Sequence, residues 1–402
     1  MCIGFNTEGV NIFYLCPFVC FFCLVLASYI AGLAHFSNNA LTQNMIVSLG
    51  EILAIIPHLI SVKIQKKTFK KGSGRKSKES KTPKTTLSVQ YEYNDQEESI
   101  RQISPKTILL LGFVDFLQSL NFFYGNFFTN YQIYCWSSHI LFLCIFTKNV
   151  LALPIYRHHL VSLAIFFILD VVHIIFVLLD ESIKCEKIIF IFLIVSSICF
   201  SFELVYEKRI MEAHFISVYQ LCFLVGLSTF FFSLIISIIM TIVSSLLEKK
   251  IKFIFSYSNY FEEISGDIYM EIILIVIYML LTGFYNVFQF LTIKNLSPSH
   301  SLITQIMLAF FCSLMNKLFM DMKDITWIIS ITVHSVCIIT LFIFLEVIEL
   351  KFCGIDKNTK HNISKRANLE KYMDQTCPDE TINENDDTTY GNEITDEINT
   401  TF

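Results

Sequence analysis

The sequence has 402 residues, of which 54% are apolar and 16% are charged, with a formal net charge of −5. Residues 63–106 and 351–402 hold 17 charged residues each, so the other 306 positions hold only 31. A region so poor in charge cannot cover a soluble globule with polar surface, which excludes a soluble enzyme, a nucleic-acid-binding protein and a secreted disulfide scaffold.

Ten apolar stretches are each long enough to cross a bilayer, whose core needs about 20 apolar residues per helix. They lie near residues 11–34, 44–62, 107–126, 133–154, 159–179, 187–206, 215–245, 270–293, 300–320 and 325–349. Because the runs are continuous rather than alternating, helices are favoured over a β-barrel. The sequence therefore predicts an all-α polytopic membrane protein with about ten transmembrane helices.

The loop at residues 63–106 decides the predicted orientation. From Lys63 to Lys84 it carries ten basic residues and one acidic residue, whereas the neighbouring loops at 35–43 and 127–132 carry no Lys or Arg. Basic loops stay in the cytosol, so this loop and, with ten spans, both termini are expected there. The loop and the acidic tail at 350–402 are expected to be disordered, and the basic stretch at 63–84 also suits anionic lipid headgroups.

An internal repeat links the third and eighth apolar stretches. Gly112-Phe-Val-Asp-Phe-Leu-Gln-Ser-Leu120 and Gly283-Phe-Tyr-Asn-Val-Phe-Gln-Phe-Leu291 share Gly, Asp or Asn, and Gln at an offset of 171 residues. This offset is typical of five duplicated helices, with one repeat at 11–179, interrupted by the loop at 63–106, and the other at 187–349. Since five is odd, the two repeats are expected to be inverted, as in many secondary transporters that bind solute between the repeats.

Several short motifs resemble the drug/metabolite transporter superfamily. They are Leu49-Gly-Glu51, Gly112-Phe-Val-Asp115, Glu203-Leu-Val-Tyr-Glu-Lys208, Phe284-Tyr-Asn286 and Asn295-Leu-Ser297. More narrowly, the sequence resembles the F-type members of solute carrier family 35, and the chloroquine-resistance-transporter-like branch is the second resemblance. The resemblance implies a secondary-active transporter of the endomembrane system. The family has an arginine in its fourth helix, where this chain has Trp136-Ser-Ser138, and an arginine and an aspartate near the start of its ninth, where this chain has Ser301 and Gln305. A strongly anionic cargo is therefore not expected.

The candidate substrate-binding residues are polar side chains at membrane depth, where an ionisable group is costly and therefore a functional candidate. Glu51 could bind a cation or exchange a proton, or it could pair structurally with another helix. Asp115 with Gln118 and Asn286 with Gln289 occupy equivalent places in the two repeats. They could line a central cavity or instead join the repeats by hydrogen bonds.

Asp170 and His173 are candidates for proton coupling. Their i, i+3 spacing allows the two side chains to meet, and histidine titrates near neutral pH. A buried structural pair is the alternative. Glu203 and Glu207 lie one turn apart at the end of the sixth stretch, and Glu207, beside Lys208, is expected at the membrane interface.

No catalytic motif, nucleotide-binding loop, cofactor site or metal site is expected from the sequence. The favoured function is a secondary-active transporter that moves a small polar metabolite by alternating access, and no enzyme activity or nucleic-acid partner is expected. A membrane scaffold without transport activity is the alternative, and a lipid-handling protein is a third option. The expected partners are the solute and the lipid bilayer, and a homodimer stays open.

Overall fold

The computed structural model describes residues 3–5, 15–33, 40–60, 62–63, 103–127, 136–181, 189–214, 216–246, 268–319, 323–350, 359, 362–363 and 365–366. Ten of the helices within these residues each overlap one of the ten predicted stretches: α1 (Cys16–Leu33), α2 (Ala40–Ile52), α5 (Pro105–Phe127), α6 (Trp136–Val150), α7 (Arg157–Leu179), α8 (Ile189–Ala213), α9 (Val218–Leu246), α12 (Ile268–Asn295), α13 (Pro298–Phe319) and α14 (Asp324–Phe344). Most of the basic loop and of the acidic tail, whose disorder the sequence predicts, lies outside the described residues.

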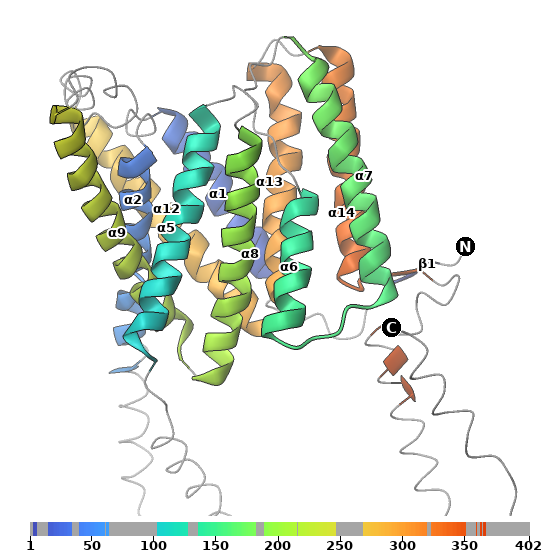
Figure 1. Ribbon diagram of the computed structural model, residues 1–402, viewed down its shortest axis with the longest axis horizontal. Coiled ribbons are helices and arrows are strands. Elements are labelled where there is room, and N and C mark those ends of the chain that lie inside the picture. Colours follow the sequence, from blue (N-terminus) through green and yellow to red (C-terminus); the bar gives the residue numbers. More distant parts are fainter. Residues whose placement is uncertain are drawn as a thin grey trace, which may run out of the picture.

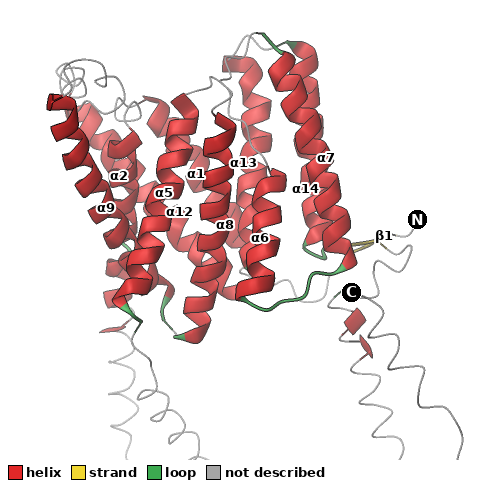
Figure 2. Ribbon diagram, viewed as in Figure 1, coloured by secondary structure: helices red, strands yellow, loops and turns green. Residues whose placement is uncertain are grey.

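Seven helical segments in the described part of the chain are long and apolar enough to cross a membrane. They run over residues 41–60, 157–179, 190–213, 218–243, 268–295, 298–315 and 324–344, and two shorter apolar helices cover 16–31 and 138–150. The helices stand side by side in one bundle (Figures 1 and 2). Large apolar side chains such as Phe167, Ile168 and Leu179 are exposed on its outside. The chain therefore has the helices and the apolar surface of a multi-pass membrane protein.

Proline sets several helix boundaries. Pro105 and Pro298 stand at the first positions of α5 and α13, where the missing N–H costs nothing. Pro57 has the opposite effect within the second span, because it offers no N–H to the carbonyl of Leu53. That carbonyl instead accepts the N–H of Ile56 at 3.0 Å. α2 thus ends at Ile52, one residue after Glu51, and the helix resumes at residue 55.

The helices pack in a regular scheme of neighbours. The most extensive contacts join α1 to α12, α5 to α8, α2 to α9, α5 to α9, α2 to α12, α6 to α8 and α7 to α14. The contact of α2 with α12 depends on two glycines, because a Cβ on Gly50 would lie 2.4 Å from the carbonyl oxygen of Met279 and one on Gly283 would lie 2.5 Å from that of Gly50. Backbone therefore meets backbone at this crossing.

A short antiparallel β-pair joins a segment that precedes α1 to a segment that follows α14. β1 (Ile3–Phe5) pairs with β2 (Ile348–Leu350), which follows α14. The pair lies at the end of the bundle where α5 begins, and the turn between α6 and α7 lies at the same end (Figure 1). This end thus gathers the described segments closest in sequence to the basic loop.

Candidate functional site

A cavity of about 260 Å³ lies inside the bundle. Its walls come from α1, α2, α5, α6, α8, α12 and α13, so both halves of the chain contribute. The volume is close to the lower end of the range for small-molecule sites, about 300–1,000 Å³. Among the described lining residues none comes from α7, α9 or α14, which leaves the α7–α14 pair outside the site.

The five side chains predicted to bind substrate all line this cavity: Glu51, Asp115, Gln118, Asn286 and Gln289. Glu51 and Asn286 contact each other across the α2–α12 interface, where Nδ2 of Asn286 donates a hydrogen bond to Oε1 of Glu51. Only 5% of Glu51 and 8% of Asp115 is exposed. The sequence leaves open whether these polar side chains line a cavity or form hydrogen bonds between helices, and in the structure they do both.

Asp115 is held by α9. Oγ1 of Thr229 lies 2.6 Å from Oδ2 of Asp115 and 3.1 Å from the carbonyl oxygen of Gly112. Gly112 permits this approach, because a Cβ there would lie 2.3 Å from that of Ser228. The carboxylate is thus oriented by a residue outside the cavity lining.

The Thr229 hydrogen bond makes a testable contribution to stability. Thr229→Val keeps the side-chain shape but leaves the buried Asp115 carboxylate without this donor, so we expect a loss of about 1–3 kcal/mol. The thermal unfolding midpoint of the purified protein in detergent measures the loss. Thr332→Val is the matched control, because Thr332 is exposed and bonds only to its own helix at Ile328. Equal midpoints for the two variants would show that Thr229 does not hold Asp115.

Two further carboxyl groups, on α8, complete an acidic wall. Glu203 and Glu207 line the cavity, and 8% and 1% of their surfaces are exposed. α8 continues to Ala213 rather than ending near residue 206, so Glu207 lies within the helix and not at its end. Oε2 of Glu207 makes no hydrogen bond. The one-turn spacing of the two glutamates on an apolar helix was the signal that could have placed both in the cavity.

Aromatic and amide side chains form the remaining polar surface. Nε2 of Gln43 donates to the hydroxyl of Tyr278 at 3.1 Å, and Nε2 of Gln305 donates to that of Tyr285 at 3.0 Å. All four residues line the cavity. The sequence reasoning did not select them, because a lone Tyr or Gln in an apolar helix does not reveal which way it points. His139, also in the lining, lies 3.2 Å from the Ser197 hydroxyl through Nδ1.

Asp170 and His173 lie elsewhere, on the buried face of α7. Nε2 of His173 is 3.1 Å from the Ser330 hydroxyl, and its ring meets that of His334 edge-on at 4.9 Å. Nδ1 of His334 lies 3.0 Å from the Ser313 hydroxyl. These residues form a polar cluster between α7, α13 and α14, and the cavity lining includes neither Asp170 nor His173.

The cavity is acidic and lacks a basic counterpart. Four carboxyl groups line it, and no Lys or Arg occurs among its described lining residues. Several ionised carboxylates buried together repel one another and lose hydration, so positive charge stabilises such a group. Protons on the carboxyl groups or a cationic solute can supply this charge. Aromatic rings beside carboxylates also suit a cation, which binds to ring faces.

No protein-family model matches the sequence, and no curated protein matches it.

Proposed function

We propose that the protein is a secondary-active transporter that moves a small polar solute by alternating access through the acidic cavity. The observation that carries the proposal is the cavity itself, in which side chains from both halves of the chain converge on one polar space inside an apolar bundle. An ionisable residue at membrane depth is costly, and four around one cavity mark a solute or ion pathway. A bundle that served only as a scaffold would gain nothing from this arrangement.

The packing scheme supports an architecture of ten spans in two inverted five-helix repeats. Each of the first five helices can be exchanged with its counterpart, in chain order, among the last five. The α1–α12 pair then becomes α8–α5, and the α2–α12 pair becomes α9–α5. The pairs α2–α9 and α7–α14 stay the same. All of these pairs are in contact. Such a set is expected from a two-fold axis between repeats, with the substrate site near the axis.

The same exchange relates individual contacts. A shift of 171 positions takes Gly112 to Gly283 and Asp115 to Asn286, and a shift of 178 takes Gly50 to Ser228 and Glu51 to Thr229. The close approach of Gly112 to Ser228 then corresponds to that of Gly283 to Gly50. The hydrogen bond from Thr229 to Asp115 corresponds to the one between Asn286 and Glu51. Matched contacts at matched positions support duplication more strongly than the motif alone.

The solute that fits this site is neutral or cationic. The four carboxyl groups and the absence of Lys and Arg from the described lining disfavour phosphate and carboxylate groups. The chain's resemblance to solute carrier family 35 thus extends to the architecture that we propose, whereas the chemistry of the cavity argues against nucleotide sugars. Exchange or proton coupling supplies the driving force in this proposal, and the carboxyl groups are the coupling sites.

The proposal includes a topology. The end of the bundle that carries the β1–β2 pair and the α6–α7 turn faces the cytosol, because the basic loop leaves from this end and basic loops stay inside. Both termini then lie in the cytosol. The resemblance points to an endomembrane compartment.

A thermal-shift screen of the purified protein tests the solute class. Organic cations, amino acids, peptides and nucleotide sugars are each added in excess, and a solute present at about 100 times its Kd stabilises the folded protein by about 2.7 kcal/mol. We expect stabilisation by neutral or cationic solutes and none by nucleotide sugars. Stabilisation by nucleotide sugars alone would contradict the proposed solute class, and no shift with any solute would favour the scaffold.

A further inference from the structure

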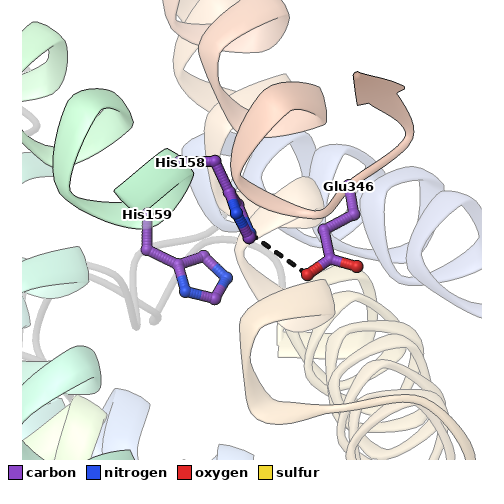
Figure 3. A group of neighbouring side chains, drawn as sticks. All are labelled: His158, His159 and Glu346. Carbon is purple, nitrogen blue, oxygen red and sulfur yellow. Dashed lines mark ion pairs between the residues drawn. The ribbon is translucent and has the colours of Figure 1, made fainter. Parts of the chain in front are cut away.

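A second group of polar side chains lies at the end of the bundle, where α7 begins and α14 ends. His158, His159 and Glu346 each offer one metal-ligand atom, and these atoms lie within 4.8 Å of one another. His158 and Glu346 point toward each other, and the His159 ring lies beside them (Figure 3). The two ring centroids are 4.0 Å apart. None of the three residues lines the acidic cavity.

His158 is the unusual member of this cluster. Only 3% of its surface is exposed, yet neither ring nitrogen makes a hydrogen bond. Nε2 nevertheless lies 3.1 Å from Oε1 of Glu346, whose side chain is 14% exposed. Buried polar groups almost always have a hydrogen-bond partner, and an exception requires a specific reason. A ligand shared with the carboxylate would supply that reason.

The surroundings hold the three side chains in place. The Tyr156 ring stacks on that of His158 at 5.9 Å, and His159 packs against Phe344 at 4.8 Å. Glu346 follows the last turn of α14 with a left-handed φ of 60°, and its N–H donates to the carbonyl of Ile343. Such a backbone position usually favours glycine. The chain instead places here a carboxylate that faces two imidazoles.

We propose that His158, His159 and Glu346 bind a divalent transition-metal ion of the zinc class. Two imidazoles and one carboxylate form a ligand set that zinc sites use, with a fourth position left for water. Ligands at about 2.0–2.1 Å from a tetrahedral ion lie about 3.3 Å apart, close to the distance between Nε2 of His158 and Oε1 of Glu346. Mg²⁺ and Ca²⁺ prefer all-oxygen sites and fit poorly. The ion would join the start of α7 to the segment that leads from α14 into β2.

Metal binding has one structural consequence at the start of α7. The N–H of Tyr156 donates to Nδ1 of His159 at 3.1 Å, so the neutral ring carries its proton on Nε2. Ligation through Nε2 moves that proton to Nδ1 and releases the Tyr156 N–H to another acceptor. Ligation through Nδ1 replaces the same hydrogen bond directly. In either case the ion and the N-terminal cap of α7 compete for His159.

Metal titration of the full-length protein tests the proposal. The protein is purified with an affinity tag that lacks histidine, stripped with a chelator, and titrated with Zn²⁺ or Mg²⁺ while bound metal is measured. We expect one tightly bound Zn²⁺ per chain and no binding of Mg²⁺ at the same concentrations. His158→Ala and Glu346→Gln each remove a ligand, so each should weaken Zn²⁺ binding at least 100-fold, because loss of even an outer-shell partner costs about 10–100-fold.

Two matched controls separate this site from incidental metal binding by the other histidines, acids and cysteines. His214→Ala and Glu212→Gln change the same residue types at the end of α8, outside the cluster, and should bind Zn²⁺ like the unmodified chain. If His158→Ala does not fold, Glu346→Gln, which keeps the side-chain size, carries the test alone. Equal Zn²⁺ affinity in the cluster variants and the controls would overturn the proposal, as would the absence of a tight site in the unmodified chain.

Discussion

Glu51→Gln is expected to weaken solute binding strongly while leaving the fold intact. The glutamine keeps an oxygen that can accept the hydrogen bond from Asn286, so the α2–α12 contact is preserved. It removes the negative charge from the cavity wall, and a hydrogen bond to a charged group contributes about 1.5–3 kcal/mol. Since about 1.4 kcal/mol corresponds to a tenfold change in affinity, binding should weaken about 10- to 150-fold. The thermal shift caused by the solute with the largest effect in the screen measures this loss.

Glu212→Gln is the matched control for this variant. Glu212 is 59% exposed and forms an ion pair with Lys208 on the same helix as Glu203 and Glu207. Loss of such a surface pair costs little, so the solute should stabilise this variant as it stabilises the unmodified chain. A folded Glu51→Gln protein that binds solute with unchanged affinity would show that the carboxylate is structural rather than part of the binding site.

Gly50→Ala is expected to destabilise the protein more than any other substitution considered. The new Cβ would lie 2.4 Å from the carbonyl oxygen of Met279 and 2.9 Å from the backbone nitrogen of Gly283. Because both neighbours are backbone atoms, no side chain can move aside and the two helices must separate. Overpacking a core costs about 1–3 kcal/mol, and this variant should reach or exceed the upper value. Gly283→Ala, which presses on Gly50 from the other side, should behave alike.

Ala164→Val tests whether added volume alone explains such a loss. Ala164 lies on the exposed face of α7, so the extra methyl groups meet no packed backbone and the thermal unfolding midpoint should stay close to that of the unmodified protein. A thermal unfolding midpoint for Gly50→Ala equal to that of Ala164→Val would mean that α2 and α12 do not approach as closely as described.

The helices and much of the cavity could be predicted because a bilayer imposes simple requirements. Continuous apolar runs of membrane-spanning length leave few options but helices, and an ionisable residue within such a run needs a polar surrounding. The sequence alone therefore indicates Glu51 and Asp115 as candidate binding residues. The repeated Gly, Asp or Asn, and Gln pattern linked Asp115 to Asn286, and both residues line one cavity.

Other features depend on which helices become neighbours, and no local pattern encodes this. The spacing of Asp170 and His173 indicates a shared helix face, but only the packing of α7 on α14 directs that face away from the cavity. Lys208 beside Glu207 suggests the end of a span, but α8 continues to Ala213. His158 and His159 alone do not form a metal-site motif in the sequence, because the third proposed ligand, Glu346, comes from a distant part of the chain.

Uptake of solute into protein-containing vesicles tests the central claim most directly. The purified chain is reconstituted into liposomes, and a radiolabelled form of the solute that stabilises it most is supplied outside. The account predicts saturable uptake that is faster than in protein-free liposomes, is inhibited by excess unlabelled solute and is lost in Glu51→Gln. Uptake at the protein-free rate by a folded, solute-binding protein would contradict transport and leave a binding protein or scaffold in its place.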